Sequence, residues 1–431
     1  RTGMDLVIRD LLQTGQDLPV GRVILIPSGD NAELINRPGP PGTDFKFPAD
    51  WTELSAVIPG PGLGPAVNGV PTDMITVLAA VSSSPAGEPA AVVVAVNGRV
   101  VRAEVADGLA AKGVRVGPVT DADEGALGSA LVEAPDAFVT LNDAFALEPV
   151  VVHVPAGVTV GGPVVVAHLT SGAGTATFPR LVVRAGPDSE VNVLEVQASD
   201  GAASLIVPVT ELVVDRSARV GHVTVQRLGM AAWQLGLQAS RLEAQSTLRS
   251  TSVGFGGDYT RLRTDCRMVG PGATGELDAV YFGEADQTLD FRTFQDHIAP
   301  DCTSNLLFKG AVGGRSRSVY TGMIRVGKQA RGTNAFQTNR NVKLSDEAWA
   351  ESVPNLMIEN NDVRCSHASA VGPIDEEQRF YIESRGVPTD VAERLVVTGF
   401  FDEVLGRLPV PAVRDDLRAT VAAKFERRDA S

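Results

Sequence analysis

Short apolar runs, broken by glycine, proline, serine and asparagine, fill the chain from about residue 150 to residue 373. The stretch VVVHVPAGVTVGGPVVVAHL, which begins at Val150, opens this region, and helical periodicity is almost absent until its end. Apolar runs of this length between turn residues are typical of β-strands. The pattern therefore predicts a long series of short strands.

A weak internal repeat runs through the same region. In each unit a small or polar turn precedes an apolar anchor, and successive anchors lie 28 or 29 residues apart. A near-constant step of this length predicts a solenoid, each unit being one coil of a parallel β-helix, whereas the competing β-sandwich imposes no fixed period. The anchors are Val191, Val220, Leu248, Leu277, Leu306, Ala335 and Val363.

Upstream of the repeat, three segments carry local signals. Residues 4–12 have the spacing of a short amphipathic helix. Residues 91–105 read AVVVAV-NG-RVVRAEV, and Asn97-Gly98 suits a type I′ turn between two strands. Residues 135–146 are predicted to form a helix whose apolar face carries Phe138, Leu141 and Phe145.

Helical patterns return downstream of the repeat. Residues 374–387 begin with acidic residues and end at Gly386, and a second helix is predicted to start at Thr389 or Asp390. A last helix carries Val413, Leu417, Val421 and Phe425 at steps of four. Such a small bundle is expected to dock onto the solenoid or onto a partner.

The fold class predicted is therefore mainly β, with a parallel β-helix core between an N-terminal α/β region and a C-terminal helical domain. We expect an N-terminal mixed region at 1–148, the β-helix at 149–372 and the helical domain at 373–431.

Composition narrows the function classes. A net charge of −14 argues against a general nucleic-acid-binding surface. Three scattered cysteines fit a reducing compartment, and there is neither an 18-residue apolar run nor the apolar core of a signal peptide, so we expect a cytoplasmic protein that does not enter membranes. No phosphate-binding G-x-x-x-x-G-K-[ST] motif is present.

An acid-rich window spans residues 276–297. Its carboxylates could bind calcium or act as the acid and base of a carbohydrate-active enzyme, but charge runs are usually a solvated face, which is the preferred interpretation. The acidic residues in question are Glu276, Asp278, Glu284, Asp286, Asp290 and Asp296.

The most distinctive pair is Cys365 and His367, in NNDVRCSHASAVG. In a strand, residues two apart project to the same side. Thiolate and imidazole ligands suit iron or iron–sulfur chemistry, but two ligands cannot close a site. By contrast, His153, His168 and His222 lie apart from other such ligands, and His297 lies five residues before Cys302, which is too loose for a closed zinc site.

Several motifs in fixed order resemble the SufB/SufD family of iron–sulfur cluster assembly scaffolds, with SufD the more similar branch. The resemblance extends from about Val150 to Leu408. The motifs are DHIAPDCTSNLLFKGAVGGRSRSVYTGMIRV (296–326), QTNRNVKLS (337–345), NDVRCSHASAVG (361–372), DEEQRFYIESRGV (375–387) and GFFDEVL (399–405).

The resemblance implies a right-handed β-helix, a SufB-like partner at its C-terminal end and a SufC-like ABC ATPase on the C-terminal helices. It further implies a scaffold role without catalytic residues of its own, and a transient iron–sulfur cluster shared with the partner, in which His367, with Cys365 beside it, takes part. A flavin bound by the complex is not readable from the sequence.

Two alternatives stay open at this point. The chain could be a SufB-type or self-associating, homodimeric scaffold. More remotely, it could be a carbohydrate-active β-helix enzyme that uses the carboxylates of the 276–297 window.

Overall fold

The computed structural model describes the chain at residues 24–25, 53–54, 57–60, 74–77, 89–123, 125–132 and 134–430. The chain divides into two units, residues 1–85 and 86–431. In the first unit, β1 (Ile24–Leu25) pairs antiparallel with β2 (Glu53–Leu54), and β3 (Val57–Gly60) pairs antiparallel with β4 (Met74–Val77). The helix predicted at residues 4–12 lies outside the described residues.

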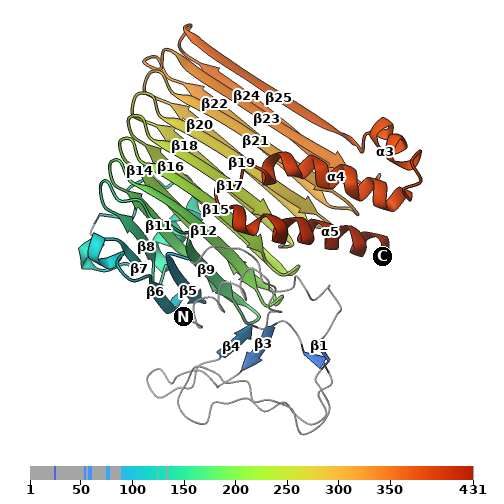
Figure 1. Ribbon diagram of the computed structural model, residues 1–431, viewed down its shortest axis with the longest axis horizontal. Coiled ribbons are helices and arrows are strands. Elements are labelled where there is room, and N and C mark those ends of the chain that lie inside the picture. The colour runs from blue at the N-terminus through green and yellow to red at the C-terminus, as the bar shows by residue number, and fades with distance from the viewer. Residues whose placement is uncertain are drawn as a thin grey trace. The chain divides into compact units, whose positions relative to one another are not determined.

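The second unit contains a parallel β-solenoid (Figure 1). The strands form two sheets, which contain 11 and 10 strands within the described residues, and from β14 to β25 successive strands alternate between them. Sheet I consists of β7 (Arg115–Pro118), β8 (Val150–Val154), β10 (Thr175–Thr177), β11 (Arg180–Ala185), β13 (Ser204–Ile206), β14 (Val209–Val214), β16 (Ala232–Leu242), β18 (Tyr259–Met268), β20 (Thr288–His297), β22 (Arg317–Val326) and β24 (Trp349–Ile358). Sheet II consists of β5 (Ala91–Val96), β6 (Arg99–Val105), β9 (Val164–Thr170), β12 (Glu190–Ser199), β15 (Arg219–Arg227), β17 (Thr247–Gly254), β19 (Thr274–Gly283), β21 (Thr303–Val312), β23 (Thr333–Lys343) and β25 (Val363–Pro373).

The strand register confirms the repeat but corrects its steps. Val191 pairs with Val220, Val220 with Leu248, and Leu277 with Leu306, as the anchors predict. At three other steps the partner is two residues away from the predicted anchor; Leu248, for example, pairs with Gly275 rather than Leu277. Because strand side chains alternate with a period of two, a shift of two keeps each anchor on the same face. The apolar anchors therefore all face the same side of the sheet, although the number of residues between paired positions is not constant.

The predicted hairpin at residues 91–105 is confirmed, and it closes one end of the solenoid. Strands β5 and β6 are antiparallel, with Asn97 at φ 49° and Gly98 at φ 80°, the left-handed conformations that a type I′ turn requires. Strand β5 also pairs with β9, and β7 pairs antiparallel with β8. These additions satisfy backbone groups at the first coil, which would otherwise be exposed sheet edges. The boundary at 148/149 stays a prediction.

Helix α2 (Ala137–Phe145) confirms the predicted element, but its buried face is different. Leu141 and Phe145 are exposed, whereas Val139 and Asn142 are buried. The Asn142 amide donates to the carbonyl oxygens of Pro179 and Val207 at 2.8 and 2.7 Å. These buried hydrogen bonds hold the rotation of the helix, which an apolar pattern alone does not predict.

The C-terminal helices are α3 (Glu376–Glu383), α4 (Thr389–Leu405) and α5 (Arg414–Ala430). Two short 3-10 helices at Ala110–Lys112 and Asp121–Asp123 follow the hairpin, and a third at Pro411–Val413 precedes α5. The four positions predicted to line the last helix are all buried. Leu395 of α4, by contrast, is 50% exposed.

Helices α4 and α5 lie across the outer face of sheet II (Figure 1). Phe282 of β19 contacts Phe401 and Phe425, with ring centroids 6.4 and 5.4 Å apart. Lys309 of β21 is buried beneath α4 and donates to Glu403 and to the carbonyl oxygen of Phe400. Apolar packing and this buried cation therefore hold the helices against the sheet. Among the described residues, no helix combines the length and apolar character needed to cross a membrane.

The interior of the solenoid is apolar along much of its length but contains a buried ion pair. Glu195 of β12 lies 3.2 Å from the Nε2 atom of His222 on β15, and both side chains are almost completely buried. Burial by itself raises the pKa of Glu195. The hydrogen bond and charge of His222, with smaller contributions from His168 and Gln197, outweigh that effect and lower the pKa to about 2.

Substituting Glu195→Gln is expected to destabilise the fold by about 3–5 kcal/mol, because it removes the buried carboxylate that His222, Gln197 and Thr210 contact. Since the folded-state pKa lies below the ordinary value of 4.5, the stabilisation is complete above pH 4.5 and is lost as the pH falls towards 2. Urea unfolding at several pH values measures both effects. The control Glu276→Gln removes an exposed ion pair with Arg249 and should cost less than about 1 kcal/mol. Equal losses in the two variants would contradict this assignment.

A second carboxyl group, which lies beneath α4, has a shifted pKa that makes the stability of the fold depend on pH. Burial raises the pKa of Asp278 on β19 to about 7; the nearby carboxylates of Glu276 and Glu403 act in the same direction, while Arg407 opposes them. The unfolded chain ionises this group near its ordinary value of 3.8. Stability should therefore decline as the pH rises from about 4 to 7, because the folded protein must then hold a poorly compensated charge.

We accordingly expect Asp278→Asn to stabilise the protein at pH 8, by about 1–4 kcal/mol, and to have little effect near pH 4. Thermal unfolding at the two pH values measures the difference. Asp286→Asn is the control, because Asp286 is an exposed residue of the same acidic window that pairs with Arg315. It should produce no gain at pH 8. A gain of equal size from Asp278→Asn at both pH values would show that titration is not its cause.

Candidate functional site

Cys365 and His367 lie on β25, the last strand of sheet II. Cys365 pairs in register with Ala335 of β23, and His367 with Gln337. Ala335 and Gln337 are buried in the solenoid interior. The two candidate ligands therefore continue an inward-facing row, as their i, i+2 spacing predicted.

The last coil is an open end of the solenoid. Strand β24 ends sheet I and β25 ends sheet II, and no described strand pairs beyond either of them. Most residues of these two strands are exposed, whereas those of the preceding coil alternate between buried and exposed. The backbone groups on the outer side of both strands are therefore free to pair with another chain.

The two candidate ligands differ in their surroundings. Cys365 is half-buried against a small apolar cluster that includes Ile324 and Ala335, and this burial raises the pKa of its thiol. His367 is exposed. The histidine can thus contact a partner directly, while the thiol must lose a proton in a partly apolar setting before it can bind a metal.

The described residues do not complete a metal site here. No group of three or more histidine, cysteine, aspartate or glutamate side chains within the described ranges is arranged to hold a metal ion. Iron–sulfur clusters usually need about four ligands. Two side chains at an open edge could therefore supply only part of the ligand set that a cluster needs.

Below the last coil the interior is polar, a feature that the sequence alone did not indicate. Gln337 is almost fully buried beneath His367, and neither amide atom of its side chain has a hydrogen-bond partner in the part of the chain that the structure describes. Further along the same strand, β23, Asn339 donates to Tyr281 of β19, whose hydroxyl donates to Asn341 at 2.8 Å. Strand register, which the sequence did not specify, decides that these polar residues face inward.

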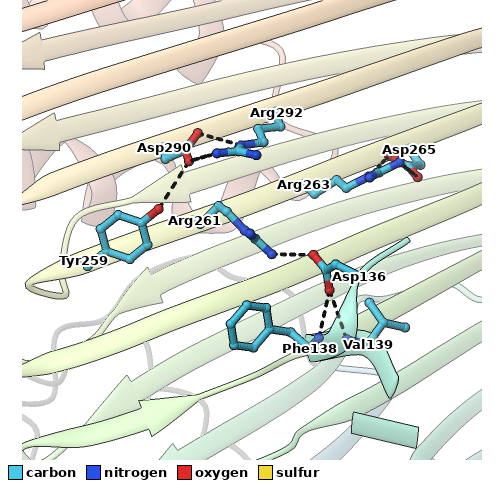
Figure 2. Close-up of polar contacts among 9 residues, drawn as sticks. All are labelled: Asp136, Phe138, Val139, Tyr259, Arg261, Arg263, Asp265, Asp290 and Arg292. Atoms are coloured by element: carbon cyan, nitrogen blue, oxygen red, sulfur yellow. Dashed lines mark hydrogen bonds and ion pairs between the residues drawn. The ribbon is translucent and has the colours of Figure 1, made fainter. Parts of the chain in front are cut away.

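The acidic window does not form one site. Asp278 is on the outer face of sheet II, and Asp290 is on the outer face of sheet I, so the interior of the solenoid separates them. Figure 2 shows Asp290 engaged by Arg292, which lies 2.8 Å away, and by the hydroxyl of Tyr259. A pair of catalytic carboxylates must face one substrate. This geometry argues against the carbohydrate-active alternative.

Most acids of the window are instead neutralised by neighbouring cations. The pairs are Glu276 with Arg249, Glu284 with Lys424, Asp286 with Arg315, and Asp296 with Arg325. The outer face of sheet I contains further pairs of this kind, Asp265 with Arg263 and Asp136 with Arg261 (Figure 2). The interpretation as a charged outer face, rather than as a calcium site, is therefore the one that the contacts support.

The other cysteines and the histidine at 297 are structural. Cys266 and Cys302 are fully buried, and burial raises the pKa of Cys266 to about 12, which makes its thiol unreactive. His297 donates to or accepts from Ser304 at 2.8 Å, and burial lowers its pKa to about 4. Its imidazole is therefore neutral and enclosed at neutral pH.

A groove lies where the ends of β23 and β25 meet helices α3 and α4. It has a volume of about 1150 Å³ and is lined by side chains that include Arg340, Val371 and Glu377. Two further lining residues, Tyr381 and Leu395, are 60% and 50% exposed. Large apolar side chains beside charged ones are typical of a protein-docking surface.

Comparison with known families identifies this architecture. Residues 168–400 match the SufBD core domain of the SUF system for FeS cluster assembly. The match extends from β9 to α4 and includes both Cys365 and His367. Similar proteins support the same assignment. An iron–sulfur cluster assembly SufBD family protein of Mycobacterium tuberculosis is 38% identical over 280 residues, which cover 63% of this chain and 68% of that protein.

Two more distant relatives carry related names. Protein ABCI7, chloroplastic, of Arabidopsis thaliana is 30% identical over 295 residues, or 66% of this chain and 62% of that protein. Iron–sulfur cluster assembly protein SufD of Bacillus subtilis is 26% identical over 280 residues, or 64% and 63%. Because the family match covers more than half of the chain and includes most of its solenoid and the open end, the chain belongs to the SufBD family of iron–sulfur cluster assembly proteins.

Proposed function

We propose that the protein is a SufD-like scaffold subunit for iron–sulfur cluster assembly. The observation that carries the proposal is the incomplete ligand set, Cys365 and His367, on an unpaired edge strand within the family's core domain. A scaffold needs to hold a cluster only transiently, so a site divided between two subunits suits the task. On this proposal the chain has no catalytic residues of its own.

The partner proposed for the open end is a SufB-like subunit with the same type of solenoid. Strand addition at β24 and β25 would satisfy their free backbone groups. It would also cover exposed apolar side chains on these strands, such as Trp349, Met357 and Val371. The same surface would serve self-association in the homodimeric alternative, which differs only in the identity of the second chain.

The cluster is the cargo of this junction. His367 is the proposed ligand from this chain because its imidazole is exposed and binds iron as the neutral base. Cys365, half-buried beside it, is the second candidate. The partner would supply the thiolates or other ligands that complete the set. A flavin bound by the assembled complex stays an open prediction, since no feature of the described residues specifies it.

The helical domain is the proposed docking site for a SufC-like ABC ATPase. The groove between the strand ends and helices α3 and α4, with Tyr381 and Leu395 exposed along it, supports this assignment. ATP hydrolysis would then belong to the partner. Such a complex is expected in the cytoplasm.

Replacing His367 with alanine is expected to lower cluster formation at least about tenfold. Removing a residue that only hydrogen-bonds a metal ligand already lowers metal affinity or activity by about that factor, and the loss of the ligand itself should cost no less. The assay is anaerobic reconstitution with the SufB- and SufC-like partners, followed by iron and sulfide analysis. The control is Ser366→Ala, since Ser366 is exposed on the same strand but faces the opposite side. Undiminished assembly in His367→Ala would overturn the role of this residue.

Thiol labelling should distinguish the three cysteines. Only Cys365 is partly exposed, so the native protein is expected to react with a small maleimide at this one residue, and denatured protein at all three. The Cys365→Ser variant should lose the native reaction. Rapid labelling of Cys266 or Cys302 in the native protein would contradict the described interior. If Cys365 lies at the junction, adding the SufB-like partner should slow its labelling.

The identity of the second chain is a separate question with its own measurement. Size-exclusion chromatography with light scattering should show one copy of this chain alone and a 1:1 complex after the SufB-like chain is added. A stable homodimer that does not exchange with the SufB-like chain would favour the self-associating alternative.

A further inference from the structure

The solenoid interior contains a second polar region, far from the open end, which we name the lumenal chamber. It is a cavity of about 20 Å³ between sheets I and II in the N-terminal half of the solenoid. Gln197 and Gln226 of sheet II, and Gln234, Gln238 and Thr260 of sheet I, line it, and each is at least 95% buried. Such a concentration of buried amides requires that their hydrogen bonds be accounted for.

Protein groups satisfy most of these amides. The Gln226 amide nitrogen donates to the Gly256 carbonyl and to Thr260 at 2.9 Å each, and its oxygen accepts from the backbone of Gly256 at 2.7 Å. The Gln197 amide nitrogen donates to Glu195 at 2.7 Å, and its oxygen accepts from Gln234. These side chains are fixed, so the walls of the chamber are preorganised.

Gln238 is the exception. Its oxygen accepts from Ser250 at 3.0 Å. Its Nε2 atom is buried and meets no acceptor from the described residues. A buried N–H donor without an acceptor costs about 1–3 kcal/mol. The fold therefore leaves one strong donor at the wall of a cavity.

The other end of the Gln238 side chain connects to the buried ion pair. Because Ser250 donates its hydroxyl proton to Gln238, it must accept from the Nδ1 atom of His222, 3.3 Å away. The Nε2 atom of His222 faces the Glu195 carboxylate, and an N–H there donates to it. Both ring nitrogens of His222 thus have a polar partner in the interior. One chain of hydrogen bonds thus runs from Glu195 through His222 and Ser250 to Gln238.

The unpaired Nε2 donor of Gln238 indicates which kind of ligand the chamber can bind. An N–H needs an acceptor, which disfavours a metal cation, and the buried carboxylate of Glu195 disfavours a second anion. A volume of about 20 Å³ exceeds the roughly 10–15 Å³ that one water molecule requires. We propose that the lumenal chamber binds one ordered water molecule, which accepts a hydrogen bond from Gln238 Nε2 and donates to hydroxyl oxygens of the threonines that line the chamber.

This water extends the hydrogen-bond chain across the interior. Glu195 and His222 belong to sheet II, whereas Gln238 belongs to sheet I. The water and the Ser250–Gln238 bond therefore join the two sheets at the level of the buried ion pair. The chamber acts as an internal hydration site that keeps a charged interior satisfied, independently of any cluster bound at the open end.

High-resolution crystal structures of the full chain test the proposal. We expect a spherical density peak within hydrogen-bonding distance of Gln238 Nε2, and its loss in Gln238→Met, which removes the donor and keeps the side-chain length. The matched control is Gln295→Met, a buried glutamine of sheet I that does not line the chamber; the peak should persist there. A wild-type chamber without the peak, or a peak whose coordination identifies a metal ion, would overturn the proposal.

A solution measurement keeps the test independent of whether the variant folds. In the wild-type protein, the Gln238 side-chain amide protons should show nuclear Overhauser cross-peaks to a long-lived water molecule. The side-chain amide of Gln226, whose donors both bind protein oxygens, supplies the internal reference. An assigned Gln238 amide without a water cross-peak would contradict the proposal, whatever the outcome of cluster assays.

Discussion

Backbone pairing between successive coils is the interaction on which this structure depends. Each strand of a sheet binds the equivalent strand of the next coil in parallel, and every such ladder fixes which side chains face inward. A single coil could not bury its own apolar face, so stability comes from stacking. The same pairing leaves a last strand with no neighbour. At the first coils, β5 pairs parallel with β9, and β6 and β7 then add antiparallel strands to β5 and β8, but β24 and β25 have no such additions within the described residues.

The candidate site follows from that asymmetry. Cys365 and His367 continue an inward row whose deeper members, Ala335 and Gln337, are buried by the coil above them. In the last coil the same row is uncovered. A soft thiol and a borderline imidazole thus lie on an unpaired edge strand, in a family named for iron–sulfur cluster assembly. On the proposed function, a site divided between subunits would link cluster binding to assembly, because the ligand set would be complete only in the complex.

The C-terminal helices pack against the outer face of sheet II, whereas the candidate site lies at its last strand. Phe282, Lys309 and the buried parts of α4 and α5 make the helices an integral layer rather than a tethered domain. Asp278 beneath α4, with its raised pKa, makes this layer sensitive to pH near neutrality. The surface proposed for partner docking on α3 and α4 therefore rests on the solenoid through α4, which contacts β19 and β21.

The sequence by itself determined the β-solenoid, the hairpin, the C-terminal helices and the shared face of Cys365 and His367. These features depend on local turn chemistry and on side-chain periodicity, which a strand or helix expresses wherever it lies. Only the tertiary structure decided the coil steps, the buried face of α2, the separation of Asp278 from Asp290 and the polar interior around Gln238 and Gln337. Each of these depends on strand register or on side-chain hydrogen bonds between residues distant in sequence. A shift of two residues in register leaves the apolar pattern unchanged, so the pattern could not reveal which polar groups meet.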